Sequence, residues 1–132
     1  MADKIDQIYA AIEDGQYERA IRLCQRKEIS RLLLTKSLLS FALCRTRKHA
    51  EALQVAREVC ACNPTDPAVL NALGYALRAL GADNDLVAVY ENAFGIHQTD
   101  EFAIELFQCY TRLNEHKKMQ LQTTQRKMIY TM

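Results

Sequence analysis

Apolar residues recur at intervals of three and four positions along almost the whole chain, and runs of β-branched residues are few. This spacing is typical of amphipathic α-helices, whose apolar side chains return to the same face every 3.6 residues. Only 2 prolines and 4 glycines interrupt the pattern in 132 residues. The pattern therefore predicts an all-α protein built from short helices, about eight in all, and no strands.

Polar segments and turn residues predict where these helices begin and end. Asp14-Gly15 ends the first helix, residues 45–48 are polar, and Asn63-Pro64-Thr65-Asp66-Pro67 supplies a stop, an N-cap at Asp66 and a proline at the first helical position. Further breaks are expected at residues 81–84, 95–99 and 114–115. The sequence predicts one domain over residues 1–132, with helix pairs at about 4–28, 29–62, 67–95 and 100–130.

An internal repeat runs through this pattern. Ala20 and Ala52 stand 32 residues apart, Leu39 and Leu73 stand 34 apart, and Leu73 and Leu106 stand 33 apart. A pair of amphipathic helices leaves one apolar face bare, so successive pairs complete a core by stacking on each other. A period of about 34 residues therefore predicts an α-solenoid.

Small and bulky residues recur in step with this period. They are Gly15, Tyr17 and Ala20 in the first repeat, Ala52 and Pro64 in the second, and Leu73, Gly74, Gly81, Tyr90 and Ala93 in the third. In this respect the chain resembles the tetratricopeptide repeat (TPR) family, in which small residues lie where two helices cross. The resemblance implies a right-handed α-solenoid of about four TPR-like helix pairs, of which the fourth, with Gln108 and Arg126 at positions usually small, matches least.

In such a solenoid the first helix of each pair lines a concave groove. The repeat spacing places four residues along that face, with three polar residues beside them: Tyr9, Phe41, Tyr75 and Gln108, then Asn71, Arg78 and Glu101. The aromatic residues either anchor a partner peptide or helix, or fill space between neighbouring first helices, and the sequence leaves both open. The lysines and asparagines with which some TPR domains hold a terminal carboxylate are absent from the corresponding positions, which are Ile5, Tyr9, Leu38, Ala68 and Ala72.

Motifs of catalysis are missing from the sequence. It contains no nucleophile elbow, no glycine-rich phosphate loop and no paired Cys/His spacing of a zinc site, so we expect neither an enzyme nor a bound metal or cofactor. An odd number of cysteines inside apolar stretches is typical of reduced packing residues. We therefore expect packing roles for Cys24, Cys44, Cys60, Cys62 and Cys109.

Charge is unevenly distributed along the chain. The net charge is +3 over residues 1–63, −6 over residues 64–116 and +4 over residues 117–132. Arg19, Arg22, Arg26 and Lys27 are expected on the second helix, three of them along one surface, where they either contact a polyanion such as ribosomal RNA or form an ordinary solvated face. The chain has no basic-then-apolar leader and no bilayer-length apolar run, so we expect a cytoplasmic protein with no membrane or direct DNA contact.

A more specific resemblance follows from several segments taken in order. They are Ile8-Tyr9, Asp14-Gly15-Gln16, residues 63–67, residues 86–93, residues 107–113 and Lys117-Lys118-Met119-Gln120. Together they resemble the amino-terminal repeats of the auxiliary subunits of the N-terminal acetyltransferase B (NatB) complex. The resemblance implies a non-catalytic scaffold whose partner, a GNAT-fold catalytic subunit, uses acetyl-coenzyme A.

The alternative is a stand-alone TPR adaptor that binds a peptide or helix in its groove. Auxiliary subunits of this family are several times longer than 132 residues, so the resemblance also implies an amino-terminal fragment of a longer solenoid. In that case the last helix, with Met119, Leu121, Met128 and Ile129, should carry an apolar face through which the chain self-associates.

Overall fold

The structure is a computed structural model that describes residues 2–114. Within that range it contains seven helices and no strand: α1 (Ala2–Glu13), α2 (Tyr17–Cys24), α3 (Leu33–Arg45), α4 (His49–Ala61), α5 (Pro67–Leu80), α6 (Asp83–Ile96) and a seventh helix at residues 100–114. The prediction of an all-α chain is confirmed. The helix expected to complete the fourth pair, up to residue 130, lies outside the described residues.

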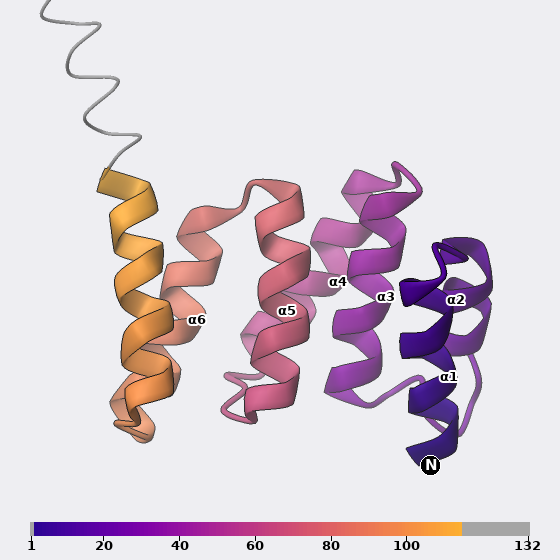
Figure 1. Cartoon of the computed structure of the whole chain (residues 1–132), viewed down its shortest axis with the longest axis horizontal. Coiled ribbons are helices and arrows are strands. Elements are labelled where there is room, and N and C mark those ends of the chain that lie inside the picture. Colours follow the sequence, from indigo (N-terminus) through magenta and orange to yellow (C-terminus); the bar gives the residue numbers. More distant parts are fainter. Residues whose placement is uncertain (1, 115–132) are drawn as a thin grey trace, which may run out of the picture.

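The helices form two layers that extend in one direction, as Figure 1 shows. α1, α3, α5 and the seventh helix make one layer, and α2, α4 and α6 make the other. Each of α1 to α6 contacts its neighbour in sequence, and α1 with α3, α3 with α5 and α4 with α6 also pack together. This arrangement of stacked helix pairs is an α-solenoid, as the repeat predicts.

Local sequence explains both ends of α5. The Asp66 carboxylate accepts a hydrogen bond from the Ala68 N–H at 3.0 Å, Pro67 occupies the first turn, and Gly81 ends the helix in the left-handed conformation. Each residue type suits its position. The Asp side chain accepts a hydrogen bond from a free backbone N–H, Pro has no backbone N–H that needs an acceptor, and Gly tolerates positive φ. These predicted boundaries are therefore confirmed.

α2 is shorter than the sequence predicts. It ends at Cys24, and residues 25–32 form successive turns, with hydrogen bonds from the Ile29 N–H to the Arg26 carbonyl and from the Leu32 N–H to the Ile29 carbonyl. These turns bury Ile29 completely in the cluster formed mainly by α1 to α4. Burial of this side chain favours the turns over a longer helix.

Small residues lie where helices of a pair cross. Ala20, Ala52 and Ala93 have no exposed surface. The Ser40 hydroxyl on α3 donates a hydrogen bond of 2.7 Å to the Ala52 carbonyl on α4, so the two backbones come close at this crossing. Two apolar clusters, one mainly around α1 to α4 and one mainly around α4 to the seventh helix, meet at Leu34 and Leu80, which contact both.

Tight turns join the helices of the first three pairs, and each holds one residue at positive φ. These residues are Gly15 (φ 75°), Arg47 (φ 67°) and Gly81 (φ 71°), spaced at 32 and 34 residues. Glycine adopts this conformation without a Cβ clash, whereas a residue such as arginine is strained there. The second turn therefore stores backbone strain that the other two avoid.

We expect Arg47→Gly to raise the free energy of unfolding by about 1 kcal/mol, since the strain is relieved and the exposed Arg47 side chain makes no hydrogen bond or ion pair within residues 2–114. Urea denaturation followed by circular dichroism measures this change. The matched control is Gly81→Ala, which should lower stability by about 1 kcal/mol at an equivalent turn. A less stable Arg47→Gly variant would contradict the argument.

The cysteines do not all pack as expected. Cys24, Cys44 and Cys109 are buried and Cys60 is half-buried, but Cys62 is exposed at the end of α4. The packing prediction is wrong for Cys62, because α4 ends at Ala61 and Cys62 is the exposed C-cap residue that follows it. No group of three His, Cys, Asp or Glu side chains between residues 2 and 114 is placed to hold a metal ion. None of the helices in that range has the length and apolar character to cross a membrane.

Stability should fall in alkaline solution. Burial raises the pKa of the Cys24 thiol to about 12, that of Cys60 to about 11 and that of the Tyr90 phenol to about 12. Each group keeps its proton to a higher pH when folded than when unfolded, so its contribution is complete below pH ~8.5 and is lost as the pH rises toward 12. Urea denaturation at pH 8 and pH 10 should show a loss of up to about 2 kcal/mol from Cys24. Cys24→Ala should make the decline shallower, and an equally steep decline would exclude this cause.

Candidate protein-interaction groove

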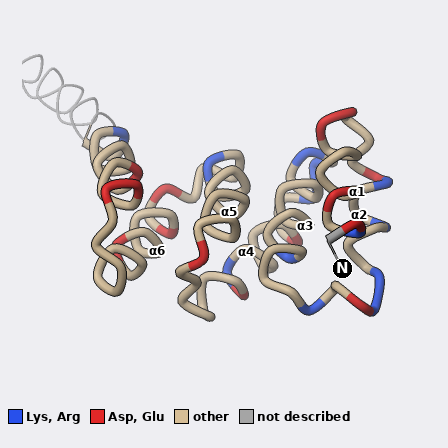
Figure 2. Tube along the Cα trace, turned by 60° about the horizontal axis from the view of Figure 1, so that its bottom comes forward, with Lys and Arg blue, Asp and Glu red and all other residues tan. Residues whose placement is uncertain are grey.

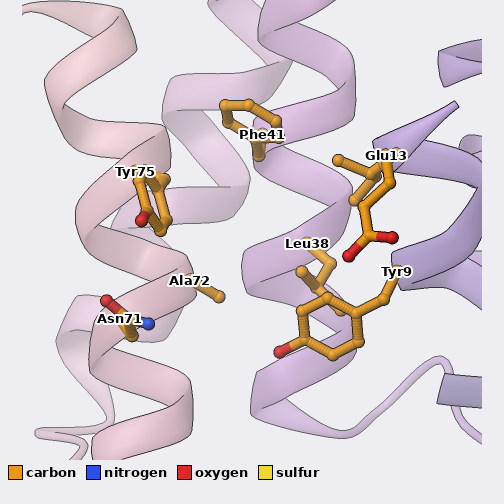
Figure 3. A pocket seen from close by; sticks show the side chains of 8 residues that line it. Tyr9, Glu13, Leu38, Phe41, Asn71, Ala72 and Tyr75 are labelled. Carbon is orange, nitrogen blue, oxygen red and sulfur yellow. The ribbon is translucent and has the colours of Figure 1, made fainter. Parts of the chain in front are cut away.

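A cavity of about 330 Å³ opens on the layer formed by α1, α3 and α5. Figure 3 shows the side chains around it, which come from all three helices. They are Tyr9, Ile12 and Glu13 of α1, Leu38 and Phe41 of α3, and Asn71, Ala72 and Tyr75 of α5. We call this cavity the groove. Four residues expected on the concave face, Tyr9, Phe41, Asn71 and Tyr75, lie together in it.

Three of the residues that line the groove are aromatic: Tyr9, Phe41 and Tyr75. The Phe41 ring meets the Tyr75 ring edge to face with centroids 6.4 Å apart, and Tyr17 meets Phe41 in the same way at 6.3 Å. Phe41 is half-buried by these contacts, whereas Tyr75 remains 56% exposed and Tyr9 37%. Phe41 thus fills space between neighbouring first helices, while the two tyrosines present apolar surface to solvent.

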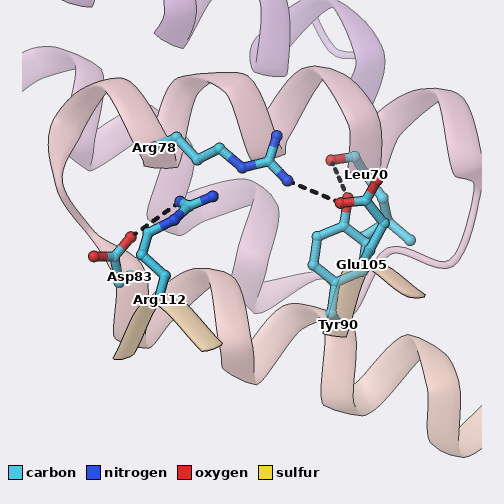
Figure 4. A network of polar contacts seen from close by, with 6 residues as sticks. All are labelled: Leu70, Arg78, Asp83, Tyr90, Glu105 and Arg112. Carbon is cyan, nitrogen blue, oxygen red and sulfur yellow. Dashed lines mark hydrogen bonds and ion pairs between the residues drawn. The ribbon is translucent and has the colours of Figure 1, made fainter. Parts of the chain in front are cut away.

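The structure separates the other three predicted groove residues from the cavity. The Arg78 guanidinium, at the last turn of α5, is half-buried and forms an ion pair of 2.9 Å with Glu105 on the seventh helix (Figure 4). Glu101 and Gln108 are exposed on that helix and do not line the groove. Arg78 is therefore held by the neighbouring repeat, because its long side chain reaches a carboxylate 27 residues later in the chain.

Two of the contacts in Figure 4 attach the seventh helix to the third pair, and one joins the helices of that pair. Besides the Arg78–Glu105 pair, Arg112 lies 3.5 Å from Asp83 at the start of α6. The Tyr90 hydroxyl on α6 donates a hydrogen bond of 3.4 Å to the Leu70 carbonyl on α5. These polar contacts position the stacked helices relative to each other.

Four residues that line the groove are not among the seven predicted groove residues: Ile12, Glu13, Leu38 and Ala72, of which Leu38 and Ala72 were considered only as positions where a carboxylate clamp is absent. Leu38 and Ala72 stand 34 residues apart, so the repeat period itself was a signal for both. Glu13 follows Tyr9 by one helical turn and therefore shares its face. These residues are found when the repeat period is applied to every position on the groove-facing side of each first helix.

The groove is acidic. Glu13 is the only charged residue that lines it, and the carboxylate has no ion-pair partner within residues 2–114. The pKa of the Tyr9 phenol is raised, first by partial burial and then by the negative charge of Asp66. Two carboxylates therefore act on the groove: Glu13, which lines it, and Asp66, whose charge reaches Tyr9.

The four basic residues proposed as a polyanion contact do not share one helix. Arg19 and Arg22 are exposed on α2, but α2 ends at Cys24, so Arg26 and Lys27 lie in the turns that follow. The Arg26 guanidinium donates a hydrogen bond of 3.1 Å to the Gln7 side chain on α1. The expectation of one helical stripe is therefore wrong. Lys and Arg nevertheless gather around α1 to α4, whereas Asp and Glu are spread over both halves of the described chain (Figure 2).

Stacked helix pairs with a period of about 34 residues, small residues at the crossings and an open groove on the first helices define a TPR solenoid. The model of the family described as "Psidin, N-terminal TPR repeats region" matches residues 3–128. The chain belongs to this family.

Two similar proteins carry the name "N-alpha-acetyltransferase 25, NatB auxiliary subunit", one from Homo sapiens and one from Mus musculus. Each is 34% identical to the chain over 116 residues, which is 86% of this chain. The protein of the same name from Rattus norvegicus is 33% identical over the same length. The aligned part covers 12% of each relative.

Proposed function

We propose that the chain is part of a non-catalytic TPR scaffold, the auxiliary subunit of a NatB-like N-terminal acetyltransferase complex in the cytoplasm. One observation carries the proposal, namely 34% identity to proteins named NatB auxiliary subunits over 86% of the chain. The solenoid supports it, since repeated helix pairs create extended surfaces for protein partners.

In this function the chain contributes protein contacts and a separate GNAT-fold subunit contributes the chemistry. The catalytic subunit holds acetyl-coenzyme A and transfers the acetyl group to amino termini of nascent chains. The residues of this chain act by shape and charge, with the first helices of the repeats available to a polypeptide partner.

Affinity purification of the full-length gene product, followed by mass spectrometry, tests the proposal. We expect a GNAT-fold acetyltransferase to co-purify in stoichiometric amount and to acetylate peptides that begin with Met-Asp or Met-Glu. Recovery of the product without any acetyltransferase would overturn the proposal. That result would favour the second candidate, a stand-alone TPR adaptor, which the open groove with its exposed Tyr9 and Tyr75 supports.

We further propose that Arg19 and Arg22, together with Arg26 and Lys27 beyond α2, contact ribosomal RNA. The support is their exposure or partial exposure near one end of the solenoid, where basic residues outnumber acidic ones. Binding through phosphates weakens steeply with salt. Co-sedimentation with ribosomes should therefore fall about tenfold or more between 50 and 200 mM salt, and salt-insensitive co-sedimentation would exclude this contact.

A further inference from the structure

We propose that the groove binds a polypeptide segment in which a lysine or arginine stands next to an apolar side chain. The proposal deepens the scaffold function and rests on it only in taking a polypeptide as the partner. Its residues are Tyr9, Glu13, Phe41, Asn71 and Tyr75.

The shape and apolar character of the groove favour a side chain inserted from a partner. The volume of about 330 Å³ lies at the lower end of ligand cavities, which begin near roughly 300 Å³. Leu38, Phe41 and Ala72 contribute apolar surface to its lining, as does the exposed Tyr75 ring. Tyrosine beside an apolar cavity is a frequent anchor in protein interfaces, because a rigid ring buries much area at small entropic cost.

Charge determines which partner this cavity takes. Glu13 lies at the cavity without an ion-pair partner in the described part of the chain, and Asp66 adds negative potential near Tyr9. The arginines of α3 and α5, Arg45 and Arg78, are engaged elsewhere. The Arg45 guanidinium lies over the Tyr17 ring at 5.4 Å, and Arg78 is paired with Glu105.

A carboxylate ligand would therefore meet repulsion and find no cation among the residues that line the groove, whereas a lysine or arginine would meet the Glu13 carboxylate. Its cation would also gain from the faces of the tyrosine rings at the same cavity. The preferred ligand thus has a charge opposite to that of the acidic chain termini held by carboxylate-clamp TPR domains.

Phage display of random twelve-residue peptides on the whole 132-residue chain tests the proposal. We expect the selected peptides to share a lysine or arginine within two positions of Leu, Ile, Met or Phe. Labelled synthetic copies then report binding by fluorescence anisotropy. Tyr75→Ala should weaken binding about tenfold or more, whereas the exposed Gln108→Ala, outside the groove, should leave it unchanged.

A charge cycle separates the role of Glu13 from general packing. Glu13→Gln should weaken binding about threefold to fivefold. Replacing the lysine or arginine of the peptide by norleucine should weaken binding to the wild type by the same factor, but should not weaken binding to Glu13→Gln. Glu13→Lys should invert the preference, so that a peptide with glutamate at the cation position binds better than the original. Glu13 is exposed, and thermal unfolding of each variant verifies the fold.

Three results would overturn the proposal: no selected peptide, selected peptides without an enriched cation, or equal binding to wild type and Glu13→Lys. A dimer in analytical ultracentrifugation that dissociates in Tyr75→Ala would assign the groove to a second copy instead. Co-purification of an acetyltransferase with the Glu13→Lys full-length product is a separate measurement. The scaffold function is therefore tested independently of peptide binding in the groove.

Discussion

Replacing Leu73 by alanine is expected to lower the free energy of unfolding by about 3 kcal/mol. Leu73 has no exposed surface and lies on α5 in the apolar cluster shared mainly by α4, α5, α6 and the seventh helix. Removing its isobutyl end loses the transfer free energy of the buried carbons and leaves a cavity that helices held on both sides cannot close. Urea denaturation followed by circular dichroism measures the loss.

The matched control is Tyr75→Ala, two residues later on the same helix. Tyr75 is 56% exposed, so its truncation should change the free energy of unfolding by no more than about 0.5 kcal/mol. A loss at Tyr75 as large as that at Leu73 would mean that the groove tyrosine is a core residue. The assignment of this surface to a partner would then fail.

Enlarging Ala52 to leucine is expected to destabilise the chain by about 2 kcal/mol. Ala52 is completely buried where α3 crosses α4, and its carbonyl accepts the 2.7 Å hydrogen bond from the Ser40 hydroxyl. Added carbons at this crossing would push the two helices apart and strain that bond, because interiors at native packing density hold no spare volume. Chemical denaturation measures the loss.

Ala50→Leu is the control, because Ala50 is exposed two residues earlier on α4 and leucine has nearly the helix propensity of alanine. It should leave stability within about 0.5 kcal/mol of the wild type. Equal stability of Ala52→Leu and the wild type would show that the crossing tolerates bulk, contrary to the role of small residues in the repeat.

The elements that were predicted well are those whose causes are local. The cap at Asp66, the proline at Pro67 and the left-handed Gly81 satisfy or spare backbone groups within a few residues, so sequence alone places the ends of α5. The α2 end was predicted too far along because its cause is distant. Burial of Ile29 in a cluster made mainly by α1 to α4 favours turns after Cys24, and no adjacent residue signals it.

The sequence also predicts some residues of the candidate site, together with others that lie outside the groove. Tyr9, Phe41, Asn71 and Tyr75 were found by period and helical face, and they line one cavity. Arg78 lies one turn after Tyr75 and was predicted with it, but Glu105 of the next repeat pairs with its guanidinium. Which partner a long side chain reaches depends on helix stacking and cannot be read from the spacing along one helix.

α3 illustrates what only packing decides. Its hydroxyl side chains at Thr35, Ser37 and Ser40 have no exposed surface, because α3 contacts α1, α2, α4 and α5. Ser37 and Ser40 satisfy their hydroxyls on backbone carbonyls at 2.8 and 2.7 Å. A helix surrounded on most sides hides polar groups that a simple amphipathic pattern would assign to solvent.

The sequence by itself determined the helical class, the period of about 34 residues, the small residues at the crossings and the caps of α5. These follow from helix periodicity and backbone hydrogen bonding, which act over one or two turns. Only the tertiary structure decided that Glu13 is left without an ion-pair partner at the groove within residues 2–114 while Arg78 is engaged. Ion pairing depends on distances of a few ångströms between residues far apart in the chain, and the stacking of the repeats sets those distances.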